Sequence, residues 1–186
     1  MRPNPDSWRE RALRDAVLAG DAAAWRGWYD EHFARLAAYA RWRCGGLVDL
    51  ADDVTQETWL TAVRTLRKFD PSRGPFIGWL RGIAGNAARN AVRSRKRAAR
   101  RVQPLGDHDA PHPEADPAAV EKAERTAAAL AELPEQYEAV LRAKYFDGQT
   151  VAEIAADTGV TAKGIESLLS RARQAFREAY EATGTP

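Results

Sequence analysis

The stretch TVAEIAADTGVTAKGIESLLSRARQAFREAY, residues 150–180, decides the fold of the C-terminal part of this chain. Thr150 and Glu153 have the spacing of a capping box, which opens a short helix. Gly159 can adopt the left-handed backbone conformation that ends this helix abruptly, and Thr161 can cap the next one. A short helix, a tight turn and a longer helix are typical of a helix-turn-helix, whose second helix enters the major groove of DNA.

The second of these helices has an apolar stripe and a polar face, which separate at about 100° per residue. Arg171 and Arg173 flank the polar face, where phosphate contacts are expected. An ordinary amphipathic surface helix would also have two faces, but the capping box, the glycine turn and the basic outer face together favour DNA binding. The predicted contacts on this face and its flanks are Lys163, Glu166, Ser167, Ser170, Arg171, Arg173, Gln174 and Arg177.

Charge and composition divide the chain into three parts. Residues 1–101 have 20 basic and 11 acidic side chains, residues 102–120 have four acidic and no basic ones, and residues 121–186 have eight basic and 11 acidic ones. The segment VQPLGDHDAPHPEADP, residues 102–117, contains four prolines and almost no apolar side chains, so it cannot bury enough surface to offset the entropy of ordering. It is predicted to be a flexible linker, and all six tryptophans precede it.

Both sides of the linker are rich in alanine, leucine, arginine and glutamate, and neither has the alternating pattern of strands. The expected fold class is therefore all-α, with two small helical domains at residues 7–100 and 118–182 joined by a flexible linker at residues 101–117, the C-terminal domain being a helix-turn-helix. Asp21 and Asp49 are expected N-caps. The expected helices span residues 7–19, 22–43, 50–68, 75–97, 118–132, 134–146, 150–157 and 162–181.

Several function classes are not supported by the sequence. A membrane span needs about 18 or more consecutive apolar residues, and no such run is present, so no membrane insertion is expected. Cys44 is the single cysteine, which excludes intramolecular disulfides and a cysteine-rich zinc site and suits the reducing cytoplasm. His108 and His112 lie in the linker, where no rigid scaffold would hold a metal. No phosphate loop or nucleophile motif is found, so enzymatic activity, a cofactor and a metal site are not expected.

An acidic stripe is predicted on the helix at residues 50–68. In the stretch DLADDVTQETWLTAVRTL, Asp49, Asp53 and Glu57 are spaced four residues apart and therefore share one helical face, with Gln56 beside them. Like charges at this spacing destabilise an isolated helix by about 0.2–0.5 kcal/mol per pair. From the residues alone, a solvated face near a helix N-terminus and a docking surface for a partner are equally supported.

The stretch FDPSRGPFIGWLRGIAGNAARNAVRSRKRAARR, residues 69–101, combines a loop rich in proline and glycine with a strongly basic helix. Seven of the 13 residues from Arg89 to Arg101 are basic, more than compensation of the helix dipole requires. Amides and aromatic side chains alternate with the arginines, which favours nucleic-acid contact over a merely solvated tail. The predicted contacts are Asp70, Ser72, Arg73, Phe76, Trp79, Asn86, Arg89, Asn90, Arg93, Arg95 and Lys96.

In their order and separation these motifs resemble the extracytoplasmic-function (ECF) sigma factors of the sigma-70 family, over residues 22–97 and 118–180. The run from Leu133-Pro134 through the helix-turn-helix is similar to the fourth region, which implies binding to the minus-thirty-five promoter box. ADDVTQETW resembles the docking signature of the second region and implies that the acidic stripe binds the clamp coiled coil of the largest polymerase subunit. FIGWLRGIAGNAARNAVR resembles the part that recognises and melts the minus-ten box, where the preceding loop captures a flipped base.

The resemblance implies an alternative sigma factor that binds core RNA polymerase and promoter DNA in the cytoplasm, needs no cofactor and has no enzymatic activity. An anti-sigma factor is a further partner typical of the family. Three residues depart from the family pattern: Glu166 stands in place of a common lysine, Gly85 of an arginine and Asn90 of an aspartate. The alternative interpretation is a conventional helix-turn-helix regulator, which would not bind core polymerase.

Overall fold

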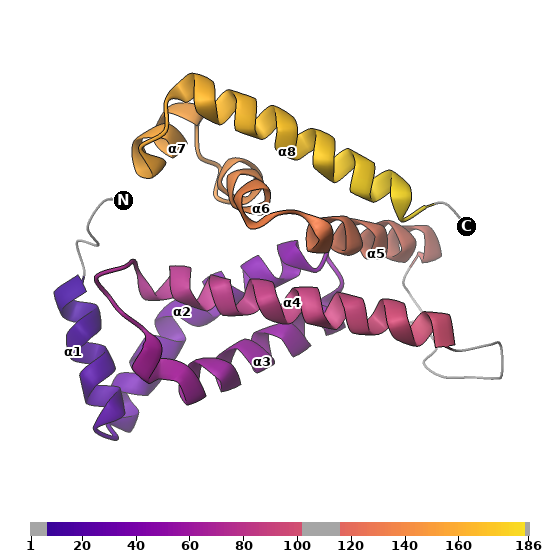
Figure 1. Ribbon diagram of the computed structural model, residues 1–186. Coiled ribbons are helices and arrows are strands. Elements are labelled where there is room, and N and C mark those ends of the chain that lie inside the picture. Colours follow the sequence, from indigo (N-terminus) through magenta and orange to yellow (C-terminus); the bar gives the residue numbers. More distant parts are fainter. Residues whose placement is uncertain (1–6, 102–115, 185–186) are drawn as a thin grey trace.

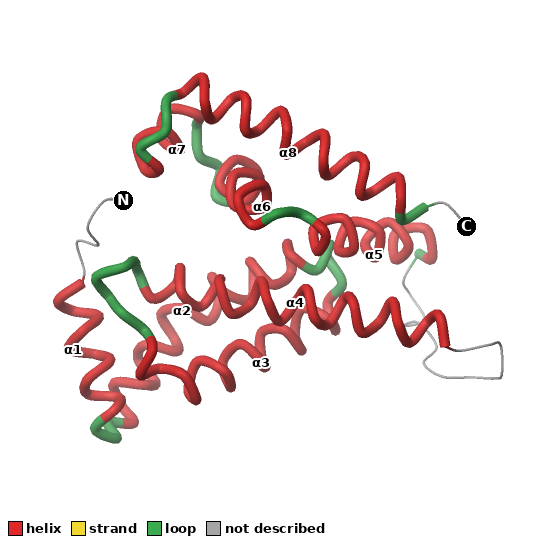
Figure 2. Tube along the Cα trace, viewed as in Figure 1, coloured by secondary structure: helices red, strands yellow, loops and turns green. Residues whose placement is uncertain are grey.

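All regular structure in the computed structural model, which describes residues 7–101 and 116–184, is helical, as the sequence predicts (Figure 2). Helices α1 to α4 form an N-terminal unit, and α5 to α8 form a C-terminal unit that lies across it (Figure 1). None of the described helices is both long and apolar enough to cross a membrane. The helices are α1 Ser7–Leu18, α2 Ala22–Arg43, α3 Val48–Thr65, α4 Phe76–Arg101, α5 Pro117–Glu132, α6 Glu135–Leu141, α7 Val151–Thr158 and α8 Ala162–Ala182, with a 3₁₀ turn at Leu66–Lys68 and a π-helical turn at Arg142–Phe146.

Local sequence explains where α2 begins but not where α3 begins. The Asp21 side chain caps α2, as expected, and accepts hydrogen bonds from two backbone nitrogens at 2.9 and 3.0 Å. The expectation that Asp49 caps α3 is wrong. The helix begins at Val48, two residues before its predicted start, and its N-cap residue Leu47 has no side-chain acceptor. Asp49 lies instead in the first turn, where a carboxylate is still favoured by the helix dipole.

The N-terminal unit is built around an aromatic core. Trp28 of α2 stacks on Phe76 of α4, with ring centroids 3.8 Å apart and an interplanar angle of 20°, and Phe69 packs edge-on against Phe76 at 5.2 Å. Buried aromatic pairs of this kind contribute about 0.5–1.5 kcal/mol each beyond the burial of their area. Because Phe69 and Phe76 flank the loop at residues 70–75, both ends of this loop are anchored in the core.

The C-terminal unit contains the expected helix-turn-helix. Thr150 and Glu153 form the capping box of α7, in which each side chain accepts a hydrogen bond from the backbone nitrogen of the other residue. Gly159 ends α7 in the left-handed conformation, with a φ of 74°, and Thr161 caps α8. The apolar stripe of α8 packs against α5, α6 and α7, and its buried members are Ile165, Leu169 and Ala172.

The two units have separate cores that meet along α5. Ala127 and Ala131 of α5 belong to the buried core of the N-terminal unit, whereas Leu130 of the same helix belongs to that of the C-terminal unit. Trp42 of α2 packs against both cores. One helix therefore supplies side chains to two cores, and the units are docked against each other over an extended contact.

The linker between the units is predicted at residues 101–117. Its first and last residues are helical, since α4 extends through Arg101 and α5 begins at Pro117. The alanine- and arginine-rich end of α4 has a high helix propensity, which accounts for the extension of this helix past its predicted end. Residues 102–115, with His108 and His112, lie outside the described residues.

Candidate functional site

The loop at residues 70–75 presents a polar tip above a buried base. Pro71 is buried, whereas Ser72 and Arg73 are exposed, the Arg73 side chain to 85%. The Asp70 carboxylate accepts hydrogen bonds from the Ser72 hydroxyl and backbone nitrogen at 2.7 and 3.0 Å, and these bonds hold the pKa of Asp70 below its ordinary value. Asp70 and Arg73 also form an ion pair at 3.5 Å. The tip is therefore a hydrogen-bonded turn that offers a hydroxyl and a guanidinium to a ligand.

Two aromatic residues that the sequence predicts at a DNA interface lie in or against the core. Phe76 is 0% exposed and stacked on Trp28, so the expected contact between Phe76 and DNA is not compatible with this structure. Trp79 is half-buried beside Phe69 and Phe76, with ring centroids 5.4 and 5.6 Å away. An aromatic side chain in the first turn of a helix suits a core as well as a base, so the sequence pattern could not separate the two roles.

The exposed face of α4 carries amides and arginines predicted from the sequence. Asn86, Asn90 and Arg93 recur at the spacing of one helical face, and all three are exposed. Arg89 lies half-buried at the edge of this face, and its Nε has no hydrogen-bond partner within the described residues. A row of amides and cations of this kind can bind bases and phosphates together.

Arg95 lies on the other side of α4 from this face. Its nine-residue separation from Asn86 corresponds to a rotation of about 180° around the helix. The Arg95 guanidinium is 4.0 Å from the Glu124 carboxylate of α5 and therefore faces the C-terminal unit. Lys96 is exposed. The basic residues predicted as one DNA-binding set are thus distributed over two sides of the helix.

The acidic stripe on α3 is exposed and borders an apolar groove. Asp49, Asp53, Gln56 and Glu57 all face solvent, as the sequence predicts. The groove lies between α2 and α3 and has a volume of about 460 Å³. Residues that line it are Trp25, Tyr29, Phe33, Ala37, Asp52, Thr55, Gln56, Trp59, Leu60 and Val63.

Three apolar side chains in this groove were missed by reasoning from the sequence. Phe33, Leu60 and Val63 are exposed to 41%, 45% and 57%. Apolar side chains gathered at the surface beside polar residues mark sites that bind other proteins. Leu60 and Val63 follow Glu57 by three and six residues, so the sequence contained a signal: apolar residues continue the outward face of the acidic stripe.

Five of the predicted contacts on α8 form the outer face of the helix-turn-helix. Lys163, Glu166, Ser167, Ser170 and Arg171 are exposed in the N-terminal half of the helix, next to α7. The N-terminal residues of such a helix are those that reach base edges in the major groove. All five side chains are exposed, and Arg171 donates a hydrogen bond within its own helix, to the carbonyl oxygen of Ser167 at 3.4 Å.

The other three predicted contacts on α8 are engaged within the chain. Arg173 donates a hydrogen bond to the Tyr145 hydroxyl at 2.7 Å, and its guanidinium lies 5.8 Å from the centroid of that ring. Gln174 accepts from Arg177 at 3.1 Å and donates to Glu178 at 2.8 Å. Arg173 and Arg177 line a groove of about 820 Å³ between the two units. The large apolar residues that line this groove include Trp42, Leu130, Leu141 and Phe176.

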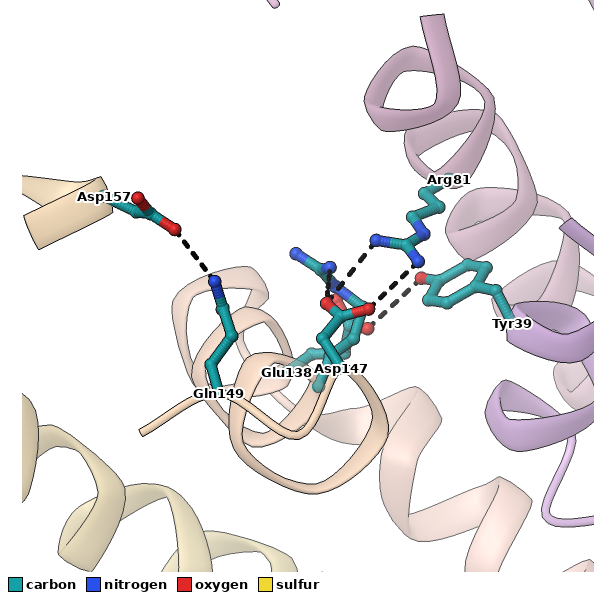
Figure 3. A network of polar contacts seen from close by, with 7 residues as sticks. Tyr39, Arg81, Glu138, Asp147, Gln149 and Asp157 are labelled. Atoms are coloured by element: carbon teal, nitrogen blue, oxygen red, sulfur yellow. Dashed lines mark hydrogen bonds and ion pairs between the residues drawn. The ribbon is translucent and has the colours of Figure 1, made fainter. Parts of the chain in front are cut away.

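A polar network joins α2 and α4 to the C-terminal unit (Figure 3). Arg81 donates to both carboxylate oxygens of Asp147, at 3.0 and 3.5 Å, and its guanidinium lies 5.6 Å from the centroid of the Tyr39 ring. The Tyr39 hydroxyl donates to Glu138 at 3.2 Å in a buried contact. Burial raises the pKa of Tyr39 well above its ordinary value, so the phenol remains a proton donor. These contacts hold the two units in one docked arrangement.

Gly85 makes room for this network. A Cβ at this position would lie 3.3 Å from the Tyr39 hydroxyl oxygen, closer than most such contacts in proteins. Even this one atom would require the Tyr39 hydroxyl, which donates to Glu138, to move by a few tenths of an ångström. The absence of a side chain here, which departs from the family pattern, thus has a structural reason in the contact between the units.

Two family models match this chain. The model of sigma-70 region 2 matches residues 28–98, which include α3, the loop and most of α4. The model of sigma-70 region 4 matches residues 123–176, which include α7 and most of α8. The matched segments contain nearly all of the candidate interface residues, whereas α1 precedes both segments.

Similar proteins span nearly the whole chain. ECF RNA polymerase sigma factor SigL of Mycobacterium tuberculosis is 33% identical over 174 residues, which cover 90% of this chain and 95% of that protein. RNA polymerase sigma factor CnrH of Cupriavidus metallidurans is 31% identical over 181 residues, which cover 91% of this chain and 93% of that protein. A solved structure of CnrH in complex with the cytosolic domain of CnrY matches with a TM-score of 0.50 at 27% identity, covering 92% of this chain and 97% of CnrH.

Proposed function

Because this chain belongs to the extracytoplasmic-function group of the sigma-70 family and is an alternative sigma factor, we propose that three of its surfaces bind core RNA polymerase, the minus-ten box and the minus-thirty-five box. The observation that carries the proposal is the exposed polar face of α4 directly after an anchored loop, within the segment matched by region 2. We further propose that the protein acts in the cytoplasm, and that the polymerase supplies all of the catalysis.

The acidic stripe of α3 and the adjoining groove are proposed to bind the polymerase. Apolar side chains at the centre and charged ones at the rim are typical of protein interfaces. Phe33, Leu60 and Val63 would supply buried contact area, and the carboxylates would direct association with a basic partner. A merely solvated acidic face has no need of a neighbouring apolar groove, so this juxtaposition favours docking over the solvated-face alternative.

The loop and α4 are proposed to bind an unpaired strand. A flipped base loses stacking and pairing worth a few kcal/mol, so its site must provide polar partners in return. Ser72 and Arg73 at the loop tip and Asn86 and Asn90 on α4 supply a hydroxyl, a guanidinium and two amides. Asn90 has both donor and acceptor groups, whereas an aspartate has acceptors alone. We therefore expect a base preference at this position that differs from that of relatives with aspartate.

The N-terminal half of α8 is proposed to read the minus-thirty-five box. Lys163, Glu166 and Ser167 would face base edges, and a glutamate there can accept a hydrogen bond from the amino group of cytosine. Arg171 would contact phosphate and orient the helix. Arg173 and Arg177 are left out of this surface, because the structure engages them at the groove between the units.

An anti-sigma factor is a further proposed partner. Its support is the relative CnrH, which is seen in complex with the cytosolic domain of CnrY. The groove of about 820 Å³ between the units has an apolar lining and three arginines, Arg41, Arg173 and Arg177. An acidic amphipathic helix has the chemistry that fits such a groove.

Promoter opening by reconstituted holoenzyme tests the proposed function. Asn86→Ala with Arg89→Ala should bind core polymerase as the wild type does, but yield fewer permanganate-reactive thymines on a fully paired promoter. A promoter whose minus-ten region is already mismatched should restore the signal, because unpairing is no longer required. Arg26→Ala removes an exposed arginine of α2 and is the charge-matched control. Normal opening of paired DNA by the double variant would show that other residues melt the promoter.

A further inference from the structure

Helix α1 contacts both ends of the loop at residues 70–75. The Glu10 carboxylate, on a residue that is 6% exposed, accepts a hydrogen bond from the backbone nitrogen of Phe76 at 2.9 Å. Arg14 donates from Nη1 to the carbonyl oxygen of Phe69 at 3.2 Å. Both side chains come from outside the segment matched by region 2. The loop is therefore held by a helix that precedes the family's matched segment.

The contact from Glu10 meets a need that the loop cannot meet itself. Phe76 is the first residue of α4, and the first backbone nitrogens of a helix have no acceptor within the helix. The preceding residue, Pro75, has no side-chain oxygen with which to cap it. Glu10 supplies the acceptor from another helix, and a carboxylate at a helix N-terminus is also favoured by the helix dipole. The start of α4 is thus capped by α1.

The contact from Arg14 holds the other end. Phe69 follows the 3₁₀ turn at Leu66–Lys68, and its carbonyl group points to Arg14 where the loop begins. Two hydrogen bonds from Arg14 to the Asp15 carboxylate, at 2.7 and 2.9 Å, orient the guanidinium. Because both loop ends are tied to one rigid helix, the residues between them have fewer conformations available.

We propose that α1 is a positioning element for promoter opening, and that Glu10 and Arg14 are its positioning residues. The proposal rests on the function proposed above for the loop. A loop already held in its binding conformation can capture a base without first losing conformational entropy. When the loop is released from α1, only the molecules whose loop is correctly placed can bind the unpaired strand. The apparent affinity for this strand then falls in proportion to the fraction of such molecules.

Variants of α1 in reconstituted holoenzyme test the proposal. Glu10→Ala should slow open-complex formation on paired promoter DNA by about tenfold, a change that loss of one buried hydrogen bond to a charged group can produce. Glu10→Gln keeps an acceptor oxygen and should restore most of the rate. Arg9→Ala removes an ion pair of 2.6 Å between α1 and Glu31 of α2, leaves the loop contacts in place and should open DNA normally. Binding to core polymerase should be unchanged in all three variants.

The outcomes separate this role from the function on which it rests. Arg14→Ala provides a second variant at a partly exposed side chain, in case Glu10→Ala reduces folding. Wild-type opening by Arg14→Ala and Glu10→Ala, together with a defect in Asn86→Ala with Arg89→Ala, would refute the role of α1 and leave the proposed function standing. Normal opening by every variant would refute both. An equal loss in Arg9→Ala and Glu10→Ala would show that α1 only stabilises the N-terminal unit, which also refutes positioning.

Discussion

Replacing Gly45 by alanine should separate the two units, whereas replacing Gly46 should not. Gly45 lies just after α2 with a φ of +66°, and a Cβ there would clash with the carbonyl oxygen of Ala123 and lie 2.9 Å from the backbone nitrogen of Ala127. Backbone atoms inside a helix cannot rotate away as a side chain can. Gly46 has a φ of +96°, and nothing lies within 4 Å of its Cβ position. The two substitutions therefore share the backbone strain and differ in the clash with α5.

The size of the effect follows from these two contributions. An alanine in the left-handed conformation costs about 1–2 kcal/mol, and this applies to both variants. Overpacking against atoms that cannot yield costs about 1–3 kcal/mol, and it is relieved only when α5 moves away from α2. The clash therefore lowers the ratio of docked to separated molecules in Gly45→Ala, relative to that in Gly46→Ala, by about 5- to 150-fold. Gly45→Ala should therefore populate the separated state, whereas Gly46→Ala should not.

Small-angle X-ray scattering and amide hydrogen exchange measure the separation. The radius of gyration should rise for Gly45→Ala and remain at the wild-type value for Gly46→Ala. Amides of α5 around Ala127 and Ala131 should exchange faster in Gly45→Ala, because this part of the helix loses its packing against the N-terminal core. Identical scattering and exchange in the two variants would refute the argument that close backbone contact at Gly45 requires the docked arrangement.

Three other parts of the molecule allow direct tests. Asp53→Arg with Glu57→Arg should abolish pull-down by core polymerase at an unchanged circular dichroism spectrum, and wild-type association would remove the docking role of α3. Lys163→Ala should weaken binding to minus-thirty-five duplexes in a sequence-dependent way. Arg171→Ala should weaken binding to matched and scrambled duplexes alike, because phosphate contacts carry little sequence information. Mobility shifts that show no loss of binding for either variant would contradict this expectation. Burial raises the pKa of the Cys44 thiol from 9.0 to about 11. At a pH between these two pKa values, the thiol of the unfolded chain loses its proton, whereas the thiol of the folded chain keeps it. The free energy of unfolding should fall as the pH rises through this window, and it should fall less steeply in Cys44→Ala; equal slopes in denaturant titrations would exclude the thiol as the cause.

The helices and the exposed faces could be predicted because their signals are local. The capping box of Thr150 and Glu153 and the turn at Gly159 each act within a few residues, and the structure has both where the sequence places them. Amphipathic spacing likewise determines which side of a helix faces solvent, so the outer faces of α3 and of the first half of α8 could be predicted. Asp49 was misplaced as a cap because a carboxylate is favoured at several positions of a first helical turn.

The remaining features depend on residues that lie far apart in the sequence. The hydrogen bond from Tyr39 to Glu138 joins residues 99 positions apart, and the bond from Arg81 to Asp147 joins residues 66 positions apart. No local pattern specifies such pairs, so the docking of the two units could not be predicted. The burial of Phe76 has the same origin, because it requires Trp28 of another helix to lie beneath the loop.

The contact between the units also contains a feature that opposes docking. Arg43, at the end of α2, is 0% exposed, and within the described residues its Nε, Nη1 and Nη2 have no hydrogen-bond partner. Removing a cation from water without such partners is unfavourable, and burial accordingly lowers the pKa of Arg43 below its ordinary value. The nearby Glu138 carboxylate offsets this cost only in part, since in the part of the chain that the structure describes it makes no hydrogen bond to the Arg43 guanidinium. To the extent that separation of the units exposes Arg43 to water, the cost of its burial is recovered. Burial of Arg43 therefore lowers the free energy needed for the units to separate, as they must if they bind two separate promoter boxes.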